Sequence, residues 1–221
     1  MLRVRDAMTR EVITLEPEAS AAEALGLCRE HGIRHLPVVE RGRLVGLVSD
    51  RDLRDVSPPR GTADQENTLG WVRVRDMMTT ELVTIQPLET IEHAARAFYE
   101  MRIGCLPVVG EGGELAGIIT SSDMMNTLVE LTGAHTAGSW LEVEVPNEPG
   151  QLANVTDLIR DLRVNIASVF LGPASRATYR AIVLRLETTD PSNVAESLSE
   201  AGYAISVAEP GAPAERRVER R

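Results

Sequence analysis

The sequence contains no lysine, and all 23 basic residues among its 221 are arginines. This absence excludes Schiff-base catalysis and the lysine that nucleotide hydrolases and kinases place on phosphates. Aromatic residues make up only 3% of the chain, so its core has to be built from aliphatic side chains. No apolar run approaches the ~18 residues that span a bilayer, and residues 1–10 lack the apolar stretch of a secretory signal. We therefore expect a cytoplasmic protein with no membrane partner.

Cysteine is also scarce. The two cysteines, Cys28 and Cys105, lie in apolar surroundings without the spacing of metal ligands. We interpret each as a buried free thiol, which suits a reducing compartment. The net charge of −10 disfavours nucleic acid as a partner, because phosphates are repelled by an acidic surface. The sequence predicts no metal site and no required cofactor.

An internal repeat dominates the first 130 residues. "VRDAMTREVITLEP" from Val4 parallels "VRDMMTTELVTIQP" from Val74, and "GIRHLPVVERGRLVGLVSDRDL" parallels "RIGCLPVVGEGGELAGIITSSDM", with one residue inserted near Gly112. We predict two copies of one unit, residues 1–56 and 72–132, joined by an exposed linker over 57–71. Each copy buries too little apolar surface to be stable by itself, so we expect the two copies to pack against each other.

Each copy predicts the order β-α-β-β-α. The first strands are expected at 12–15 and 82–85, and the "LPVV" strands at 36–39 and 106–109. Ser20 and Thr90 are expected to cap the first helices, the first of which Gly32 ends. The last strands, 44–48 and 115–119, lead into closing helices that Ser49 and Thr120 cap.

The doubled "MT" and "LPVV" motifs and the doubled G-h-h-[ST]-x-x-D phrase, in which h is apolar, resemble a tandem pair of CBS domains over about residues 1–130. The resemblance implies a pseudo-twofold pair that binds an adenosine nucleotide of the AMP or ATP class as a regulatory ligand. Residue by residue, it implies one site at Thr84, Cys105, Pro107, Thr120 and Asp123. It implies the other site at Thr14, His35, Pro37, Ser49 and Asp52.

The chemistry of the doubled phrase fits such a ligand. A strand-to-helix turn presents backbone N–H groups and a hydroxyl to a phosphate, and an aspartate one turn later accepts hydrogen bonds from ribose hydroxyls. The alternative is that Ser49 with Asp52, and Thr120 with Asp123, are only helix caps. We expect the two sites to be unequal, because Asp50 places a second carboxylate beside Ser49 and Asp52, whereas Ser121 and Ser122 stand between Thr120 and Asp123.

The last third of the chain has a different pattern. Residues 139–209 predict β-α-β-β-α-β, a ferredoxin-like plan, followed by a disordered tail over 210–221. "VPNEPGQLANV" and "VNIASV" resemble the ACT domain, which implies an amino-acid site at Asn147, Gly150, Leu152 and Asn165. The alternative is a dimerising sheet without a ligand. The predicted fold class is therefore α/β (α+β), a CBS pair with an ACT domain.

This domain order resembles the acetoin utilization protein family. We therefore predict a non-catalytic sensor, a homodimer that binds a nucleotide, and an amino acid at the ACT domain, to control an unidentified partner protein. One alternative is a ligand-free dimerisation scaffold for a protein partner. An enzyme is the least favoured alternative, because the sequence shows no nucleophile–base pair, no metal cluster and no phosphate loop.

Overall fold

The computed structural model describes residues 2–57, 69–135 and 137–208. The chain divides into two compact units, Met1–Met125 and Asn126–Arg221, which are described separately below. Most of the expected linker (58–68) and the whole of the expected tail lie outside the described residues. Within the described ranges, no helix is long and apolar enough to cross a membrane.

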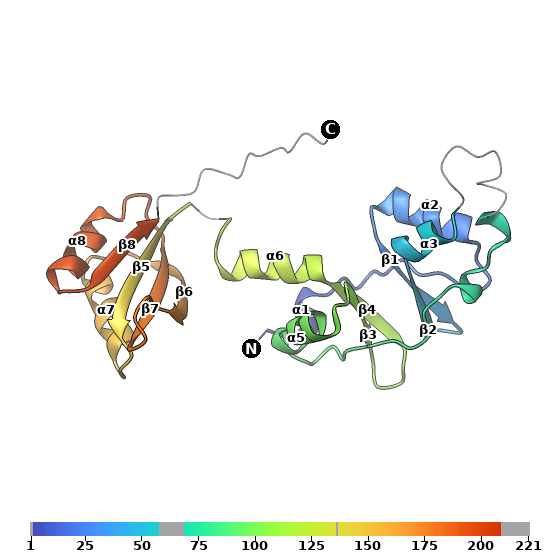
Figure 1. Ribbon diagram of the computed structural model, residues 1–221, viewed down its shortest axis with the longest axis horizontal. Helices are drawn as coiled ribbons and strands as arrows, with labels where there is room; N and C mark the ends of the chain where they lie inside the picture. The colour runs from blue at the N-terminus through green and yellow to red at the C-terminus, as the bar shows by residue number, and fades with distance from the viewer. Residues whose placement is uncertain (1, 58–68, 136, 209–221) are drawn as a thin grey trace. The chain divides into compact units, whose positions relative to one another are not determined.

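One lobe of the first unit is built mainly from the first repeat (Figure 1). Helix α2 (Ala21–His31) begins where the Ser20 hydroxyl accepts the Glu23 N–H at 3.1 Å, and it ends at Gly32, whose φ of 64° is left-handed. Strands β1 (His35–Glu40) and β2 (Arg43–Ser49) form an antiparallel pair that leads into helix α3 (Asp50–Asp55). The expected caps and hairpin are confirmed.

The second repeat builds the equivalent lobe. Helix α5 (Ile91–Met101), capped by Thr90, is followed by the antiparallel strands β3 (Cys105–Val109) and β4 (Leu115–Thr120), and then by helix α6 (Ser121–Leu131). The prediction of strands at 12–15 and 82–85 is wrong, because neither segment forms a ladder of paired residues. Each is reduced to one parallel bridge, Leu15 with Val38 and Ile85 with Val108, because the segment turns away beyond the buried residue.

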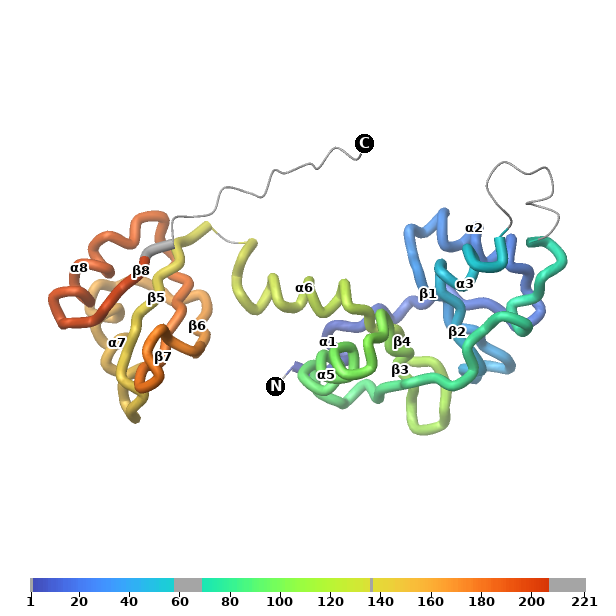
Figure 2. The backbone as a smooth tube through the Cα atoms, viewed as in Figure 1, coloured from blue at the N-terminus to red at the C-terminus, as the bar shows by residue number. Residues whose placement is uncertain are grey.

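The two repeats exchange their first segments. The short helix α1 (Val4–Ala7) lies beside α5 of the second repeat, and the Val4 N–H donates to the Glu89 carbonyl at 2.9 Å (Figure 1). In return, the 3-10 turn η1 (Val74–Asp76) bonds to the first repeat, where the Val74 N–H donates to the Ala19 carbonyl at 2.9 Å. The backbone tube shows the start of the chain crossing from α1 to α2 (Figure 2).

The exchange continues through the "MT" motifs. Thr9 bridges Ile118 of β4, and Thr79 bridges Leu47 of β2. At these crossings the methionine that precedes each threonine packs on a strand glycine. Met8 lies against Gly117 and Met78 against Gly46, with no space for a side chain at either glycine. In each case the methionine of one repeat therefore contacts the glycine of the other repeat. The two contacts join the repeats.

Each lobe has its own core, and each core draws on both repeats. Leu69, Val74, Met77 and Met78 pack into the core of the first lobe. Leu69 lies within the linker expected to be exposed, yet it is buried at the start of a helical turn over 69–71. Val4, Leu2 and Met8 pack in turn into the core of the second lobe.

The second unit has the predicted β-α-β-β-α-β order. Its four-stranded antiparallel sheet has the order β6-β7-β5-β8, with strands β5 (Ser139–Pro146), β6 (Ile166–Pro173), β7 (Tyr179–Leu186) and β8 (Ala204–Ala208). Helices α7 (Gln151–Asp161) and α8 (Ser192–Glu200) cover one face and bury Val155, Ile159, Val194 and Leu198. The alternation of Leu141, Val143 and Val145 places all three in this core, as predicted.

Candidate functional site

Two clefts open in the first unit, with volumes of about 250 and 300 Å³, near the lower end for ligand pockets. The first, named the Thr120 cleft, is lined by Thr9, Glu11, Val12, Ile13, Gly32, Ile33, Arg34, His35, Ile118, Thr120, Ser122 and Asp123. The second, named the Ser49 cleft, is lined by His35, Leu47, Ser49, Arg51, Asp52, Thr79, Glu81, Leu82, Val83, Ile103, Gly104, Cys105 and Pro107.

Residues at equivalent positions of the internal repeat line the two clefts. Thr9 in one cleft corresponds to Thr79 in the other, and Ile33 corresponds to Ile103. Each cleft takes its hydroxyl-aspartate turn from one repeat and most of its apolar wall from the other repeat. The sequence-based prediction drew each site from one repeat, whereas the residues that line each cleft come from both repeats. The reason is the exchange of the "MT" segments, which carries the residues that follow them across.

The structure brings most of the predicted residues to a cleft, in new combinations. Thr120 and Asp123 share their cleft with His35, while Cys105 and Pro107 share the other with the Ser49 turn. Ser49 and Asp52 line that cleft as predicted, and His35 lines it as well.

Three predicted residues line neither of these clefts. Thr14 and Thr84 are exposed, because the residue after each turns into a core and the alternating backbone directs the threonine outward. Pro37 is buried within β1. A binding role for these three residues stays a prediction.

Both hydroxyl-aspartate turns form closed capping boxes. In one, the Thr120 hydroxyl and the Thr120 N–H both donate to Asp123 Oδ2 at 2.7 Å, and the Asp123 N–H donates back to the hydroxyl at 3.3 Å. The Ser49 and Asp52 turn has the same bonds at 2.7, 2.8 and 3.3 Å. The capping role is therefore real. A phosphate that accepts the Thr120 hydroxyl has to displace its bond to Asp123.

Each cleft holds one arginine, at positions that the repeat does not relate. In the Thr120 cleft, Arg34 reaches across from the first repeat, and its Nη2 donates to Ser122 Oγ at 3.4 Å. In the other cleft, Arg51 comes from the same turn as Ser49. Asp50 does not line that cleft, since its carboxylate pairs with Arg54 at 2.9 Å. The expected crowding of the Ser49 cleft by Asp50 is therefore not supported by the geometry.

His35 lies in both clefts, and its environment disfavours a charge on the ring. Burial and the neighbouring Arg34 lower the pKa of His35, while Asp50 and Asp52 act in the opposite direction. The imidazole is therefore neutral at pH 7. Burial raises the pKa of the Cys105 thiol to about 12, so that this residue contributes an apolar wall and no thiolate. Cys28 is also a buried free thiol, as predicted.

The lowered pKa of His35 makes stability depend on pH. The unfolded chain binds a proton at this residue below about pH 6.5 and the folded chain resists it, so this contribution to stability is complete above that pH and is lost as pH falls through the folded pKa. Replacing His35 with glutamine should reduce the loss of unfolding free energy between about pH 7.5 and about pH 5.5. Urea unfolding at the two pH values measures this, and equal losses in both proteins would contradict it.

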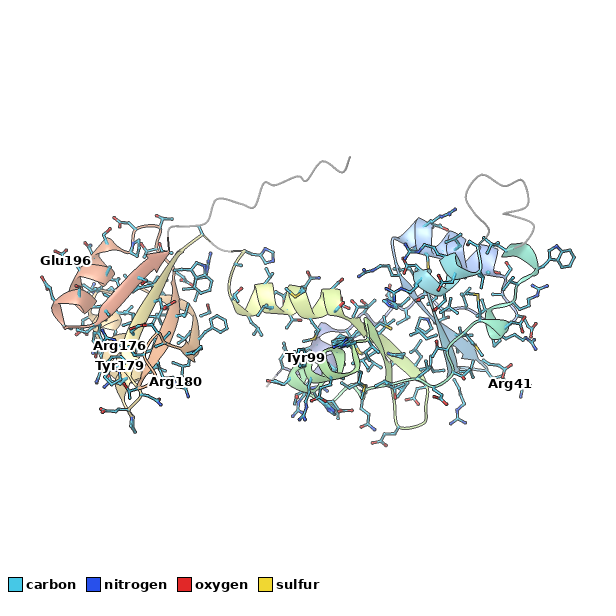
Figure 3. All side chains as sticks on the ribbon, viewed as in Figure 1. Arg41, Tyr99, Arg176, Tyr179, Arg180 and Glu196 are labelled. Atoms are coloured by element: carbon cyan, nitrogen blue, oxygen red, sulfur yellow. The ribbon has the colours of Figure 1, made fainter. Side chains whose placement is uncertain are left out.

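A third cavity, of about 340 Å³, lies in the second unit at the turn between β5 and α7. Gly150, whose φ of 92° is left-handed, precedes the first residue of α7, and three of the residues predicted for the amino-acid site, Asn147, Gly150 and Leu152, line the cavity. Arg180 of β7 lines it too, and its Nε donates to Asn147 Oδ1 at 3.3 Å. Figure 3 labels Arg180 with Arg176 and Tyr179, all from the start of β7 and the turn before it.

Asn165 does not belong to this cavity. Its side chain donates to Glu187 Oε2 at 2.8 Å, beside the Leu186 end of β7. Asn147 lies beyond the opposite end, where Pro146 pairs with Tyr179. The eight residues of β5 separate these ends by roughly 24 Å. Asn165 lies apart from this cavity because β6 enters the sheet far from the β5–α7 turn.

Sequence reasoning missed several residues of the sites. Thr9 and Thr79 belong to the "MT" motifs, and Ile33 and Ile103 stand two residues before the predicted His35 and Cys105. The repeat alignment carried this signal. Arg180 had no such signal, because only the pairing of β5 with β7 brings it to the turn.

The fold and the paired clefts define a tandem α/β repeat module with two related clefts, followed by a ferredoxin-like domain. Comparison with known protein families matches the CBS domain at residues 4–58 and 74–130 and the ACT domain at 139–202. The chain belongs to the CBS domain family and carries a C-terminal ACT domain. The predicted fold class is confirmed.

Individual proteins resemble the CBS half. Inosine-5'-monophosphate dehydrogenase of Korarchaeum cryptofilum is 39% identical over 122 residues, which are 55% of this chain and 23% of that enzyme. The chain thus spans less than a quarter of this relative.

Two solved structures share the fold of the CBS pair. One is an acetoin utilization protein (AcuB) from Vibrio cholerae, with a TM-score of 0.52 and 31% identity over 61% of this chain and 96% of that one. The other is CBSX2, solved in complex with AMP, with a TM-score of 0.51 and 29% identity over 58% and 97%.

Proposed function

We propose that the CBS pair binds an adenosine-containing ligand of the AMP class in the Thr120 and Ser49 clefts. The observation that carries the proposal is that each cleft sets a hydroxyl-aspartate turn opposite an aliphatic wall. The turn provides acceptors for ribose hydroxyls and donors for a phosphate, and the wall provides apolar contacts for a flat base. The similarity to CBSX2, which was solved with AMP, supports this class of ligand.

In the Thr120 cleft, each group has a distinct task. Asp123 accepts hydrogen bonds from the ribose hydroxyls, and Thr120 with the first turn of α6 donates to the phosphate. Arg34 supplies the positive charge beside the same turn. Ile13 and Ile33, from the first repeat, cover the base. The Ser49 cleft repeats this arrangement, with Arg51 as its guanidinium.

A thermal-shift titration of the full chain with AMP, ATP, S-adenosylmethionine and NADH tests the ligand class. An adenosine ligand at about 100 times its dissociation constant should stabilise the fold by about 2.7 kcal/mol, because it binds only the folded state. NADH, which carries a second nucleotide beyond its adenosine half, serves as the comparison. If none of the adenosine ligands raises the melting temperature, the proposal fails.

For the ACT domain, we propose a small amino acid with an aliphatic side chain. The first N–H groups of α7 and the guanidinium of Arg180 suit its carboxylate, and Leu152, Leu171 and Ile182 suit its side chain. A sheet that only dimerises remains the alternative.

Arginine 180 provides the test of this second site. Replacing Arg180 with alanine should weaken binding of an aliphatic amino acid such as L-valine by about tenfold or more, the effect of losing one charged hydrogen bond. Arg176 is the matched control, since it lies over the Tyr179 ring at 5.1 Å and does not line the cavity. Calorimetry should show binding intact in Arg176→Ala. No heat with any amino acid in the parent protein would favour the sheet without a ligand.

We propose that these ligands regulate a homodimer, which acts on a separate partner protein in the cytoplasm and catalyses no reaction itself. Ligands shift such an assembly only by binding its arrangements with different affinities. The similarity of the CBS half to an acetoin utilization protein supports that pathway as the setting. Sedimentation of the chain with and without AMP tests the dimer.

A further inference from the structure

One short segment, Arg34 and His35, contacts both clefts of the CBS pair. His35 lines the Thr120 cleft and the Ser49 cleft. Its counterpart in the second repeat, Cys105, lines the Ser49 cleft and not the Thr120 cleft. The two repeats therefore differ at the wall between the clefts, because the imidazole of His35 lines both of them.

Arg34 connects the same two places by separate atoms. Its guanidinium donates to Ser122 in the first turn of α6, beside the Thr120 cleft, at 3.4 Å. Its backbone carbonyl accepts the N–H of Asp50, the first residue of α3, beside the Ser49 cleft, at 2.9 Å. In the other repeat, the Gly104 carbonyl accepts the Ser121 N–H at 3.1 Å, but no side chain extends from this position.

The missing side chain at Gly104 is what admits the histidine. A Cβ atom at Gly104 would lie 3.3 Å from Nε2 of His35, which is closer than ordinary contact. The ring is thus held against the second repeat, and a displacement of the ring toward one cleft removes it from the other. A neutral imidazole has one donor and one acceptor nitrogen, so it cannot offer the same nitrogen to two ligands.

We propose that the two clefts are negatively coupled through Arg34 and His35, so that a ligand in one cleft weakens binding in the other. This inference rests on the proposed binding of an adenosine ligand. A phosphate in the Thr120 cleft draws Arg34 and the ring to its own side. A ligand that enters the Ser49 cleft then finds the Arg34 and His35 side chains turned toward the Thr120 cleft, so it binds more weakly. The same holds in the other direction, because coupling between two sites is reciprocal.

The test compares binding constants for AMP measured by calorimetry on the full chain. Asp52→Ala leaves only the Thr120 cleft, and Asp123→Ala leaves only the Ser49 cleft, so each variant gives a single-cleft association constant. For independent clefts, the product of the two stepwise association constants of the parent equals the product of the two single-cleft constants. Negative coupling makes the parent product smaller, by about fivefold or more.

Three further variants assign the coupling to the shared wall. The His35→Ala background removes the one side chain that lines both clefts and keeps Arg34, so the difference between the two products should be smaller there than in the parent. In Cys105→Ala, the counterpart that contacts one cleft, only the affinity of the Ser49 cleft should change and the coupling should persist. Gly104→Ala keeps the histidine but pushes its ring, and it should shift the affinities of both clefts. Thermal unfolding checks that each variant is folded.

Each possible outcome of these titrations supports or overturns the coupling between the two clefts. Equal products in the parent, or a parent product larger than the single-cleft product, would overturn the coupling while leaving the proposed function intact. A single bound AMP in both the parent and His35→Ala would overturn it too, whereas a second AMP that appears only in His35→Ala supports it. An absence of AMP binding in the parent would remove the proposed function and the coupling together.

Discussion

Replacing Asp123 with alanine is expected to weaken AMP binding in the Thr120 cleft by about 100-fold. The carboxylate accepts both ribose hydroxyls in the proposed complex, and two charge-assisted hydrogen bonds of about 1.5 kcal/mol each account for that factor. The variant also loses the acceptor that holds the Thr120 hydroxyl at 2.7 Å. Calorimetry in an Asp52→Ala background isolates this cleft, since the Ser49 cleft is then disabled.

Asp50→Ala is the matched control for this prediction. It removes a carboxylate from the corresponding turn of the other repeat, but that carboxylate pairs with Arg54 and lines neither cleft. Its affinity for AMP should stay within about twofold of the parent, because an exposed ion pair contributes little. Equal weakening by Asp50→Ala and Asp123→Ala would mean that the loss of a carboxylate charge from the module, and no ribose contact, explains both.

Adding one methyl group at Gly117 is expected to destabilise the CBS pair by about 2–3 kcal/mol. A Cβ there would lie 2.8 Å from the backbone carbonyl oxygen of Thr9, which is held in place by its bridge to Ile118. At Gly46, the atoms within that reach belong to the flexible side chain of Met78. Gly46→Ala should therefore cost less, about 1 kcal/mol. Urea unfolding of the three proteins measures the difference.

Gly26→Ala is expected to change the free energy of unfolding in the opposite direction in the same experiment. Gly26 lies within α2 with nothing within 4 Å of its Cβ position, so alanine there should stabilise the chain by up to about 1 kcal/mol through helix propensity. If Gly117→Ala is as mild as Gly46→Ala, the close approach of the "MT" segment to β4 is not rigid. The joining of the repeats by these contacts would then be contradicted.

The elements that the sequence predicted correctly are those decided by neighbouring residues. Ser20 caps α2 and Gly32 ends it, because both effects act within one turn of the helix. The alternation from Leu141 to Val145 marks β5, because one face of that strand is buried. The predicted strands at 12–15 and 82–85 were wrong because β-branched residues also suit an extended segment that pairs at one residue only.

The exchange between repeats was not predictable from the residues in the same way. Ile118 and Leu47 are equivalent positions, and either offers Thr9 a similar bridge. A sequence repeat makes the pairing within one copy and the pairing across copies nearly identical in local energy. The choice depends on the course of the whole chain. For this reason the sequence predicted Thr120, Asp123, Cys105 and Pro107 as one group, whereas the structure places the first two at one cleft and the last two at the other.

The ACT cavity gives the same lesson on a smaller scale. Asn147, Gly150 and Leu152 are close in sequence, and the turn alone brings them together. Asn165 and Arg180 depend on the direction and register of β6 and β7, which placed Arg180 at the cavity and Asn165 at the other end of the sheet. Residues contributed by distant strands are the ones that the sequence could not assign.

The most direct test of this account is a crystal structure of the full chain grown with AMP. We predict AMP in the Thr120 cleft with its ribose hydroxyls on Asp123 and its base against Ile13 and Ile33, so that one ligand contacts both repeats. An equivalent molecule in the Ser49 cleft should contact Asp52 and Ile103. The account would be contradicted by AMP held within a single repeat, between Thr120 and Thr84, or by empty clefts at a saturating concentration of AMP.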